Sequence, residues 1–540
     1  MKKKLAVATT AVLAMTMCLS MTACKDKASV DALLPKVKGS YSVSVTPLTD
    51  FVSGTMYSSN AEPDSNMVII MTKTSADGLS SKSGLYNVKT NKFVIDDIPS
   101  SDNLQQIDNT LYASYNATSL TWTLYDSTKG VYASSVEGTI DTENDIFVCK
   151  DGKRIYSTPS GAIKETTSAF DKILTTNWEI GDYYLDGSIY NGVFDVYNEK
   201  GELKNSVNLT TELNISADAE LSNYWTIGNK IFFQTERVLP EDEEEYDYYV
   251  EGDKIDLDTY SYDLKKGSGK ELKKFEYVVQ SEDCINDDTI IATVQKITDG
   301  SLSQRYIQSF NASGKVAVDL QKLVPGAIAA ESSADNKALL IADKSNTVYV
   351  YEGAKRVATI PNGYGPNPAY PSDVDFKIMV MGDYVYKIDY TSKELNIYDF
   401  KGNSVLENDN VKFAGAALDN VIYSVTPEQT DINTPVYASY YIFDTEKGIS
   451  TLIGTNSETK SYIFDMERPY CYVVADKTTL KGDIHFFEND TVITGASETE
   501  TVFDYTVYDD ENGKMYDIIG VEKDSVVSYY SIVVSYPYEK

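Results

Sequence analysis

Histidine and paired carboxylates are the residues that would carry catalysis in this chain, and neither marks a site. His485, in "DIHFFEN", is the only histidine, so a Ser-His-Asp arrangement would depend entirely on it. It stands in an alternating run, where a position on a strand is the simpler interpretation. The 81 Asp and Glu residues guarantee many close pairs, so no single pair identifies a glycosidase site. No catalytic residue is therefore assigned.

Metal ligation and cofactor binding have equally little support. Beyond the first 24 residues only Cys149, Cys284 and Cys471 occur, far apart and without a Cys-x-x-Cys pair, so they are interpreted as small apolar residues and not as zinc ligands. The acidic run from Glu241 to Asp258 lacks the spacing of a calcium loop and is interpreted as a solvated loop. The sequence predicts no metal and no cofactor.

One loop has the composition of a binding surface. "PNGYGPNPAYPSD", residues 361–373, places four prolines and two glycines around Tyr364 and Tyr370. A stiff loop that presents aromatic rings is suited to contact a sugar or a peptide. Tyr364 and Tyr370 are therefore the predicted ligand-binding residues. The alternative is an ordinary connection whose tyrosines cover the core.

The N-terminus has the three parts of a secretory signal peptide. "MKKK" supplies the positive start, an apolar stretch runs from Leu5 to Met21, and the small residues Thr22 and Ala23 precede Cys24. Threonines and a serine interrupt the apolar stretch, which disfavours a permanent membrane span. Residues 1–23 are predicted to be a signal peptide.

"MTAC", residues 21–24, resembles the lipobox of bacterial lipoproteins, although Met21 stands where the family usually has Leu. Cys18 is a poorer candidate because the large Met17 precedes it. The resemblance implies that Cys24 receives a diacylglyceryl group, becomes the new N-terminus and anchors the protein to the outer face of a bacterial membrane. Residues 24–39 would then act as a tether. An ordinary cleaved secretion signal is the alternative.

The charge of the chain excludes one class of partner. Formal net charge is −33, and no basic block follows the first few residues. Binding to nucleic acid requires a face rich in Lys and Arg that neutralises backbone phosphates. No nucleic-acid partner is expected.

Hairpins of similar sequence recur along the chain and indicate its architecture. "VFDVYNEKGELKNSV" begins at Val193, "LNIYDFKGNSVLEN" at Leu395 and "YYIFDTEKGISTL" at Tyr440. Each combines two alternating apolar runs with a polar turn that contains Gly and Lys, which is typical of a β-hairpin. No long segment repeats its apolar residues every 3.6 positions, so an all-β protein is predicted.

The spacing of the hairpins predicts a β-propeller of four-stranded antiparallel blades over residues 40–540, with an acidic insertion near 238–258. From Ser313 the hairpins at Gly353, Gly402, Lys447 and Asn489 follow in steps of 40, 49, 45 and 42 residues, close to the ~40–45 residues of one blade. Earlier hairpins lie near Thr90, Lys129, Lys200 and Gly267, with further candidates near Gly152 and Gly513.

Counted together, these hairpins exceed the usual ~4–8 blades. Some are therefore interpreted as extensions of a blade, and eight blades are favoured. Seven blades, a larger ring or two rings are the alternatives. Residues 40–45 or 525–538 would supply the strand that closes the ring.

Two segments resemble repeats of known propellers. "LYNVKTNKFVID", residues 85–96, is similar to a YVTN-type surface-protein repeat, and "LYDSTKGVYA", residues 124–133, is similar to a quinoprotein-type repeat without its Trp. The resemblance implies the fold and no activity. The missing tryptophans disfavour a quinone-dependent dehydrogenase.

These observations predict a membrane-anchored extracytoplasmic propeller that is not an enzyme. It would act as a binding or scaffolding module for a protein or glycan partner. The alternative is a carbohydrate-active enzyme, a glycoside hydrolase or lyase, that uses carboxylates in the propeller channel.

Overall fold

The computed structural model describes most of the chain. It covers residues 29–36, 40–52, 55–59, 62–75, 77–142, 144–158, 160–167, 178–198, 200–216, 219–237, 251–286, 288–366, 374–389, 392–406, 410–431, 433–465, 468–479, 481–497, 503–509, 512–523 and 526–537. Cys24 and Tyr370 lie outside the described residues.

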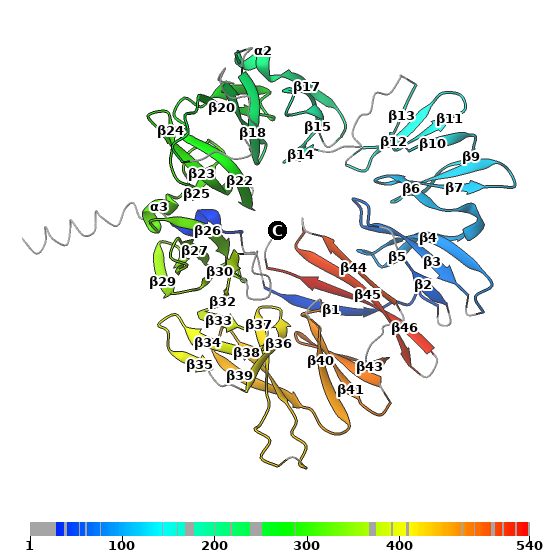
Figure 1. Ribbon diagram of the computed structural model, residues 1–540. Helices are drawn as coiled ribbons and strands as arrows, with labels where there is room; N and C mark the ends of the chain where they lie inside the picture. Colours follow the sequence, from blue (N-terminus) through cyan, green and yellow to red (C-terminus); the bar gives the residue numbers. More distant parts are fainter. Residues whose placement is uncertain are drawn as a thin grey trace, which may run out of the picture.

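Strands in the described residues form eleven four-stranded antiparallel sheets, arranged as blades around one axis (Figure 1). The first four blades consist of β2 (Met56–Ser58), β3 (Val68–Thr74), β4 (Ser81–Asn87) and β5 (Lys92–Pro99); β6 (Gln105–Asp108), β7 (Leu111–Asn116), β8 (Thr121–Asp126) and β9 (Gly130–Val136); β10 (Gly138–Asp141), β11 (Ile146–Cys149), β12 (Arg154–Ser157) and β13 (Ile163–Thr166); and β14 (Trp178–Ile180), β15 (Tyr183–Ser188), β16 (Val193–Asn198) and β17 (Leu203–Asn208).

The next four blades follow in chain order. They consist of β18 (Ala219–Ile227), β19 (Lys230–Arg237), β20 (Leu257–Asp263) and β21 (Ser268–Glu271); β22 (Tyr277–Asn286), β23 (Thr289–Thr298), β24 (Ser301–Leu302) and β25 (Tyr306–Asn311); β26 (Ala327–Ser332), β27 (Leu339–Asp343), β28 (Val348–Glu352) and β29 (Lys355–Ile360); and β32 (Ile378–Met381), β33 (Tyr384–Ile388), β34 (Leu395–Asp399) and β35 (Ser404–Leu406). In the sixth blade both β24 and β25 pair with β23.

The last three blades complete the ring. They consist of β36 (Val411–Ala417), β37 (Asn420–Val425), β38 (Ser439–Asp444) and β39 (Ile449–Thr455); β40 (Lys460–Phe464), β41 (Cys471–Asp476), β42 (Lys481–Phe486) and β43 (Asn489–Ser497); and β44 (Phe503–Asp509), β45 (Lys514–Lys523), β46 (Val526–Ser535) and β1 (Ser42–Pro47). A two-stranded sheet of β30 (Tyr364–Pro366) and β31 (Val374–Phe376) stands between the seventh and eighth blades.

The all-β propeller of four-stranded blades is thus confirmed, and the favoured count of eight blades is wrong. The eleven hairpins found in the sequence fall in eleven different sheets, so each of them belonged to a separate blade. A wider ring only requires a smaller rotation between neighbouring blades, which small changes in interblade packing supply.

Both segments proposed to close the ring take part in the closure. β1 pairs with β46 from Ser42↔Ser535 to Pro47↔Tyr530 and becomes the outer strand of the eleventh blade. The two ends of the chain therefore share one sheet. An open edge on β46 would be a template for aggregation, and β1 covers it.

The recurring hairpin turns share one hydrogen-bonded motif. Asp126 Oδ1 accepts hydrogen bonds from the backbone N–H groups of Thr128 (2.9 Å) and Lys129 (3.2 Å). Asp444 and Asp399 make the same type of bond in their own turns. Asp and Asn stabilise turns in this way because their short side chains reach the backbone two residues later. The lysine in the repeat then pairs with the same carboxylate, as Lys129 Nζ does at 2.6 Å.

Apolar layers between neighbouring blades form the core. The aromatic residue that precedes the turn Asp or Asn is buried in most blades, as Tyr86, Tyr262 and Phe443 are. These side chains pack against the next blade with β-branched residues of the central strands. A blade cannot bury both faces alone, so this packing holds the ring together.

Strand direction assigns every turn to one of two faces. Because neighbouring strands are antiparallel, the first-second hairpins lie at one end of the strands, which we call the hairpin face. The third-fourth hairpins lie at the same end in the blades whose third and fourth strands are consecutive and paired. The second-third connections lie at the opposite face. On the hairpin face, neighbouring blades are joined by hydrogen bonds such as Gly382 N–H to Asp335 Oδ2 (2.9 Å) and Asp182 N–H to Asn229 Oδ1 (2.8 Å).

Helical structure in the described residues is limited to short turns. These are η1 (Val30–Leu33), η2 (Ser100–Asp102), α2 (Leu209–Leu213) and α3 (Leu320–Leu323). Within the described part of the chain, no helix has the length and apolarity needed to cross a bilayer.

Candidate functional site

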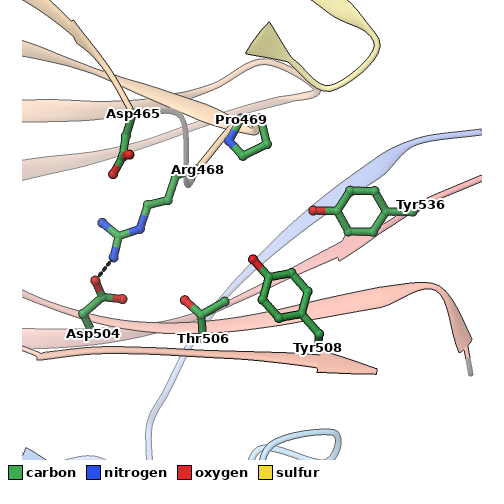
Figure 2. Close-up of a pocket in the computed structure, with 7 residues that line it drawn as sticks. All are labelled: Asp465, Arg468, Pro469, Asp504, Thr506, Tyr508 and Tyr536. Carbon is green, nitrogen blue, oxygen red and sulfur yellow. Dashed lines mark ion pairs between the residues drawn. The ribbon is translucent and has the colours of Figure 1, made fainter. Parts of the chain in front are cut away.

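A cavity of about 460 Å³ lies between the tenth and eleventh blades, next to the closure of the ring (Figure 2). Its wall combines charged, hydroxyl and aromatic side chains. The lining residues are Asp465, Arg468, Pro469, Asp504, Thr506, Tyr508 and Tyr536.

Three elements position these side chains. Asp504, Thr506 and Tyr508 alternate along β44 and therefore point to the same side of this strand. Arg468 belongs to the hairpin between β40 and β41. Tyr536 follows the last residue of β46, where its ring packs edge-to-face on Tyr41 with 5.7 Å between the ring centroids. The pocket is consequently built only when the closing blade has formed.

Arg468 is the centre of a polar network at one end of the pocket. Its guanidinium forms an ion pair with Asp504, and its Nε lies 3.4 Å from Oδ2 of Asp517. Tyr470 donates its hydroxyl to the same Oδ2, and Thr506 donates to Oδ1 at 3.4 Å. Asp517 and Tyr470 are completely buried. The arginine is therefore fixed by carboxylates from two strands of the neighbouring blade.

Burial and charge act against each other in this network. Burial raises the pKa of Asp517 to about 6, although Arg468 and Tyr470 both lower it. Burial alone would lower the pKa of Arg468, but the charges of Asp517 and its neighbours outweigh that effect and raise it. Burial and the Asp517 charge raise the pKa of Tyr470. Arg468 is thus a permanent cation, and Tyr470 stays a hydrogen-bond donor.

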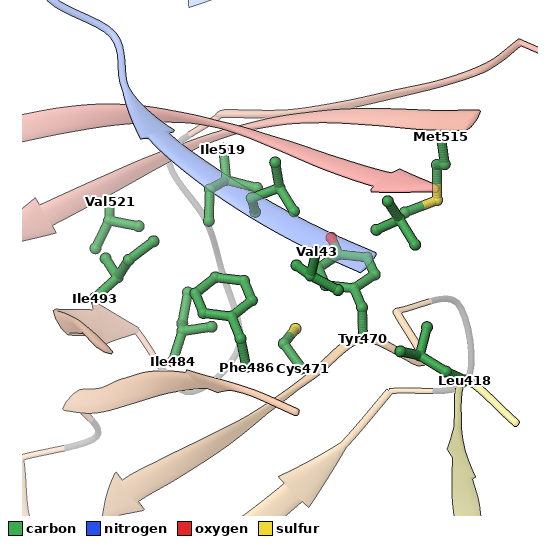
Figure 3. Packing of buried hydrophobic residues seen from close by; sticks show 12 residues of the cluster. Val43, Leu418, Tyr470, Cys471, Ile484, Phe486, Ile493, Met515, Ile519 and Val521 are labelled. Atoms are coloured by element: carbon green, nitrogen blue, oxygen red, sulfur yellow. The ribbon is translucent and has the colours of Figure 1, made fainter. Parts of the chain in front are cut away.

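An apolar layer supports the network from behind (Figure 3). Tyr470, Cys471 and Phe486 from the tenth blade meet Met515 of the eleventh blade and Val43 of β1. Burial raises the pKa of Cys471 to about 12, which keeps its sulfur protonated and unreactive. The layer thus buries the Tyr470 side of the network.

The pocket has two chemically different ends. Figure 2 shows Arg468 with Asp465 and Asp504 at one end, and Tyr508 with Tyr536 at the other. The Tyr508 side chain is 54% exposed, so much of its ring is open to a ligand. Carboxylates that accept hydrogen bonds beside exposed aromatic rings can orient a hydroxyl-rich molecule and cover its apolar face.

The predicted ligand-binding loop is described only in part. Tyr364 is half-buried on β30, and its ring packs edge-to-face on Phe376 with 5.1 Å between the centroids. It also contacts the apolar layer between the seventh and eighth blades. Tyr364 does not approach the pocket at the eleventh blade, and its predicted role in binding stays a prediction.

Other residues considered in the sequence have structural positions. His485 lies on β42 opposite Tyr472, with their rings stacked 5.1 Å apart. Cys149 and Cys471 are buried. Of the acidic run, residues 241–250 lie outside the described residues, and residues 251–258 lead into β20. In the part of the chain that the structure describes, no three His, Cys, Asp or Glu side chains are grouped to hold a metal ion.

Sequence reasoning missed the residues of this pocket. Arg468, in "MERPYCY", is one of five arginines among the 48 basic residues, and a rare arginine next to Pro and Tyr was the available signal. Tyr508 and Tyr536 carried no signal, because the sequence has 42 tyrosines and these two are brought together only by the pairing of β45 with β44 and β46.

No protein-family model matches the chain, and neither does any curated protein sequence. Among solved structures, it is similar to dipeptidyl peptidase 4 of Porphyromonas gingivalis, at 8% identity and a TM-score of 0.24 over 88% of this chain and 65% of that one. It thus spans about two thirds of that peptidase's length.

Two further solved structures have a similarly low identity and TM-score. The β-propeller domain of the Trilobed protease from Pyrococcus furiosus has 10% identity and a TM-score of 0.21 over 58% of this chain and 94% of that one. The tricorn protease has 12% identity and a TM-score of 0.17 over 90% and 49%. Scores this low decide nothing about activity, and the fold rests on the strand pairing described above.

Proposed function

We propose that this protein is a non-catalytic binding propeller, held at the outer face of a bacterial membrane by a lipid on Cys24. Its ligand site is the pocket between the tenth and eleventh blades. The observation that carries the proposal is the pairing of a fixed Arg468–Asp504 ion pair with the open ring of Tyr508 in one cavity. The favoured ligand is an uncharged carbohydrate.

Charge argues against an anionic ligand. Arg468 is already neutralised by Asp504 and Asp517, and Asp465 adds a further negative charge to the wall. A ligand carboxylate or phosphate would have to displace Asp504 and approach a protein of net charge −33. Hydroxyl groups can instead donate to the carboxylates without breaking the ion pair.

Aromatic surface favours a sugar ring among uncharged ligands. Tyr508 and Tyr536 supply apolar faces at the end of the pocket away from Arg468. Tyrosine is enriched in binding sites because its rigid ring covers apolar surface at low entropic cost. The cavity volume of about 460 Å³ lies within the ~300–1,000 Å³ of small-ligand sites.

The state of the carboxylates supports binding over hydrolysis. Glycoside cleavage needs two available carboxyl groups, one of them protonated and placed on the scissile bond. Asp504 is occupied by Arg468, and Asp517 is buried behind it. Neither is available to transfer a proton to a ligand in the cavity, which leaves Asp465 as the one other carboxylate of its wall, where cleavage requires two.

A glycan array followed by calorimetry tests the site. The chain without its signal peptide should bind a neutral oligosaccharide, and Tyr508→Ala should weaken binding about ten-fold or more. Tyr190→Ala is the matched control, because Tyr190 is similarly exposed (57%) but lies in the fourth blade. Unchanged affinity of the Tyr508→Ala variant would remove the pocket from consideration, and release of reducing sugar would establish the hydrolase alternative.

Metabolic labelling with a fatty acid tests the anchor. The parent protein should incorporate the label, and Cys24→Ala should lose it. Cys149→Ala should keep it, because Cys149 is buried in the third blade. Label retained by the Cys24→Ala variant would disprove the anchor.

A further inference from the structure

We propose that the N-terminal strand β1, with Tyr41 just before it, positions the aromatic end of the pocket, so that ligand binding and the pairing of β1 with the closing blade are coupled. The inference rests on the proposed function, because it concerns the same pocket. It adds a positioning residue outside the cavity wall and a role for the beginning of the chain in binding.

Tyr536 is the wall residue that the N-terminal segment contacts. The ring of Tyr41 packs edge-to-face on the ring of Tyr536, with 5.7 Å between the centroids and 75° between the planes. The hydroxyl of Tyr536 donates to Sδ of Met515 at 3.7 Å, and its backbone N–H donates to Gly513 O at 2.8 Å. The ring of Tyr536 is therefore held by one residue of the N-terminal segment and one residue of β45.

A row of paired residues continues this contact across the closing blade. Val43 of β1 pairs with Val534, which pairs with Met515. Met515 pairs in turn with Tyr508 of the pocket. Directly paired residues of neighbouring strands point to the same face of a sheet. Val43, Val534 and Met515 are buried in the apolar layer shared with the tenth blade (Figure 3). Tyr508 thus lies on the face to which β1 contributes.

Tyr41 and Tyr536 extend this face toward the hairpin end of the blade. Tyr41 stands two residues before Val43, and Tyr536 stands two residues after Val534. Residues two apart in extended chain point to the same side. Both tyrosines accordingly pack against the same apolar layer. The aromatic end of the pocket is consequently built with two residues from the N-terminal segment behind it.

The N-terminal strand also connects the two walls of the pocket. Nδ2 of Asn489, the first residue of β43 in the tenth blade, donates to Val43 O at 3.2 Å. The Val43 side chain packs with Tyr470 and Cys471 of the same blade, while β1 pairs with β46 of the eleventh blade. Because the cavity lies between these two blades, β1 contributes to the spacing of its walls.

The arginine end of the pocket is held by different contacts. Arg468 of the tenth blade reaches Asp504 on β44 and Asp517 on β45 directly. These ion pairs run between the two blades beside the cavity. Loss of the Tyr41 ring should therefore change the aromatic end and leave the charged end in place.

Thermodynamic linkage makes the coupling reciprocal. A ligand that contacts Tyr536 binds more tightly when Tyr41 and β1 are in place. The same ligand must then stabilise the pairing of β1 by an equal factor. Binding would thus strengthen the sheet that closes the ring.

The N-terminal segment is held a second time at η1. Val30 and Leu33 are completely buried in an apolar cluster of the sixth and seventh blades, and Val30 N–H donates to Gly353 O at 2.9 Å. Seven Cα–Cα steps separate the buried Leu34 from Tyr41, which limits their separation to about 25 Å. A β1 strand that unpairs therefore stays close to β46, and its pairing is reversible.

Fluorine NMR tests the positioning without a ligand, with 3-fluorotyrosine in place of Tyr536. Because a neighbouring aromatic ring shifts the resonance, Tyr41→Ala should move the fluorine signal, and Tyr41→Phe should keep it near its parent position. Val45→Ala is the matched control. Val45 lies on β1 and packs against the same apolar layer, but it pairs with Ile532, further along the strand. An unmoved signal in Tyr41→Ala would overturn the positioning.

Calorimetry with maltohexaose, cellohexaose and chitohexaose as probes tests the coupling. Tyr41→Ala should weaken binding about three- to ten-fold, whereas Tyr41→Phe should keep the parent affinity. Val45→Ala should lower the melting temperature and leave the affinity unchanged. Equal weakening in Val45→Ala would mean that lost stability explains the effect, and the positioning role would be wrong.

Hydrogen exchange measures the reverse direction of the coupling. Saturation with the probe that binds should slow exchange of the backbone amides of residues 42–47 several-fold in the parent and less in Tyr41→Ala. The same slowing in both proteins, or none in the parent, would contradict the coupling.

Failure of the proposed function and failure of this inference are distinguishable. If none of the three sugars, and no glycan of the array, binds the parent chain, the proposed function fails, and the fluorine signal still decides whether Tyr41 positions Tyr536. If a sugar binds to parent and Tyr41→Ala with equal affinity, the coupling is wrong while the pocket stands.

Discussion

Tyr470 donates its hydroxyl to Oδ2 of Asp517, and both side chains are completely buried where the tenth blade meets the closing blade. The pair links the first-second hairpin of one blade to the central strand of the next. A buried carboxylate is tolerated only when hydrogen bonds and an opposite charge compensate for its lost hydration. Here Tyr470, Thr506 and Arg468 supply them.

Tyr470→Phe should destabilise the protein by about 1–3 kcal/mol, because Oδ2 of the buried Asp517 loses its hydroxyl donor and keeps only Arg468 Nε at 3.4 Å. Urea unfolding monitored by tyrosine fluorescence measures the effect. Tyr472→Phe, on the same blade, is the control and should change the unfolding midpoint little. Equal midpoints for parent and Tyr470→Phe would mean that the bond adds nothing to stability.

Asp108→Asn should change how stability depends on pH. Burial, and next the charge of Asp145, raise the pKa of Asp108 to about 7, whereas the unfolded carboxyl titrates near its ordinary value of about 4. Between about pH 4 and pH 7 the folded state keeps a proton that the unfolded state loses, so the parent loses stability as pH rises. Asparagine removes this loss, and the variant should gain stability over the parent through that window.

Asp399→Asn is the opposite case and serves as the comparison. Hydrogen bonds from Asn403 lower the pKa of Asp399, so its contribution is present above the unfolded pKa and disappears as pH falls. Thermal unfolding from pH 4 to pH 8 measures both variants. If the stability of Asp108→Asn and that of the parent changed with pH in parallel, the raised pKa of Asp108 would be contradicted.

Asp126→Ala should destabilise the second blade by about 1–2 kcal/mol, since three hydrogen bonds of its turn end on this carboxylate. Lys129→Gln removes only the exposed partner of the ion pair and should cost less than about 1 kcal/mol. Chemical denaturation of both variants measures the two losses in the free energy of unfolding. A larger loss for Lys129→Gln would show that the ion pair, and not the turn, stabilises the repeat.

Tyr364→Ala should lower the melting temperature, because the ring packs on Phe376 and on the layer between two blades. Half-buried aromatic packing of this kind is worth about 1–3 kcal/mol, and Tyr364→Phe should keep most of it. The predicted ligand contact is tested on the same variants by calorimetry. An unchanged melting temperature together with lost binding would support the sequence prediction for this loop.

The hairpins were predictable because their signal is local. Alternating residues, a turn Asp or Asn and a Gly within a dozen positions are enough to indicate two strands, and all eleven were visible in the sequence. The number of blades was not, because it depends on how β-branched and aromatic layers set the rotation between blades. No short segment encodes that rotation.

The pocket was out of reach for a related reason. Arg468 and Asp504 come from different blades, and Tyr536 joins the same pocket through the pairing of β46 with β45. Residues joined by contacts between blades share no recognisable pattern in the sequence. Tyr364 is the opposite case. Its loop has a conspicuous composition in the sequence, but its ring packs against the core.

The position of η1 also decides how the molecule carries mechanical load. A pull on the chain from the side of Cys24 reaches Ser29 first, and the buried Val30 and Leu33 must leave the apolar cluster of the sixth and seventh blades before any force arrives at β1. Until then the outer strand of the closing blade is under no tension. A force applied at Cys24 would therefore first separate η1 from the blades, while the ring, and the pocket beside its closure, keep their shape.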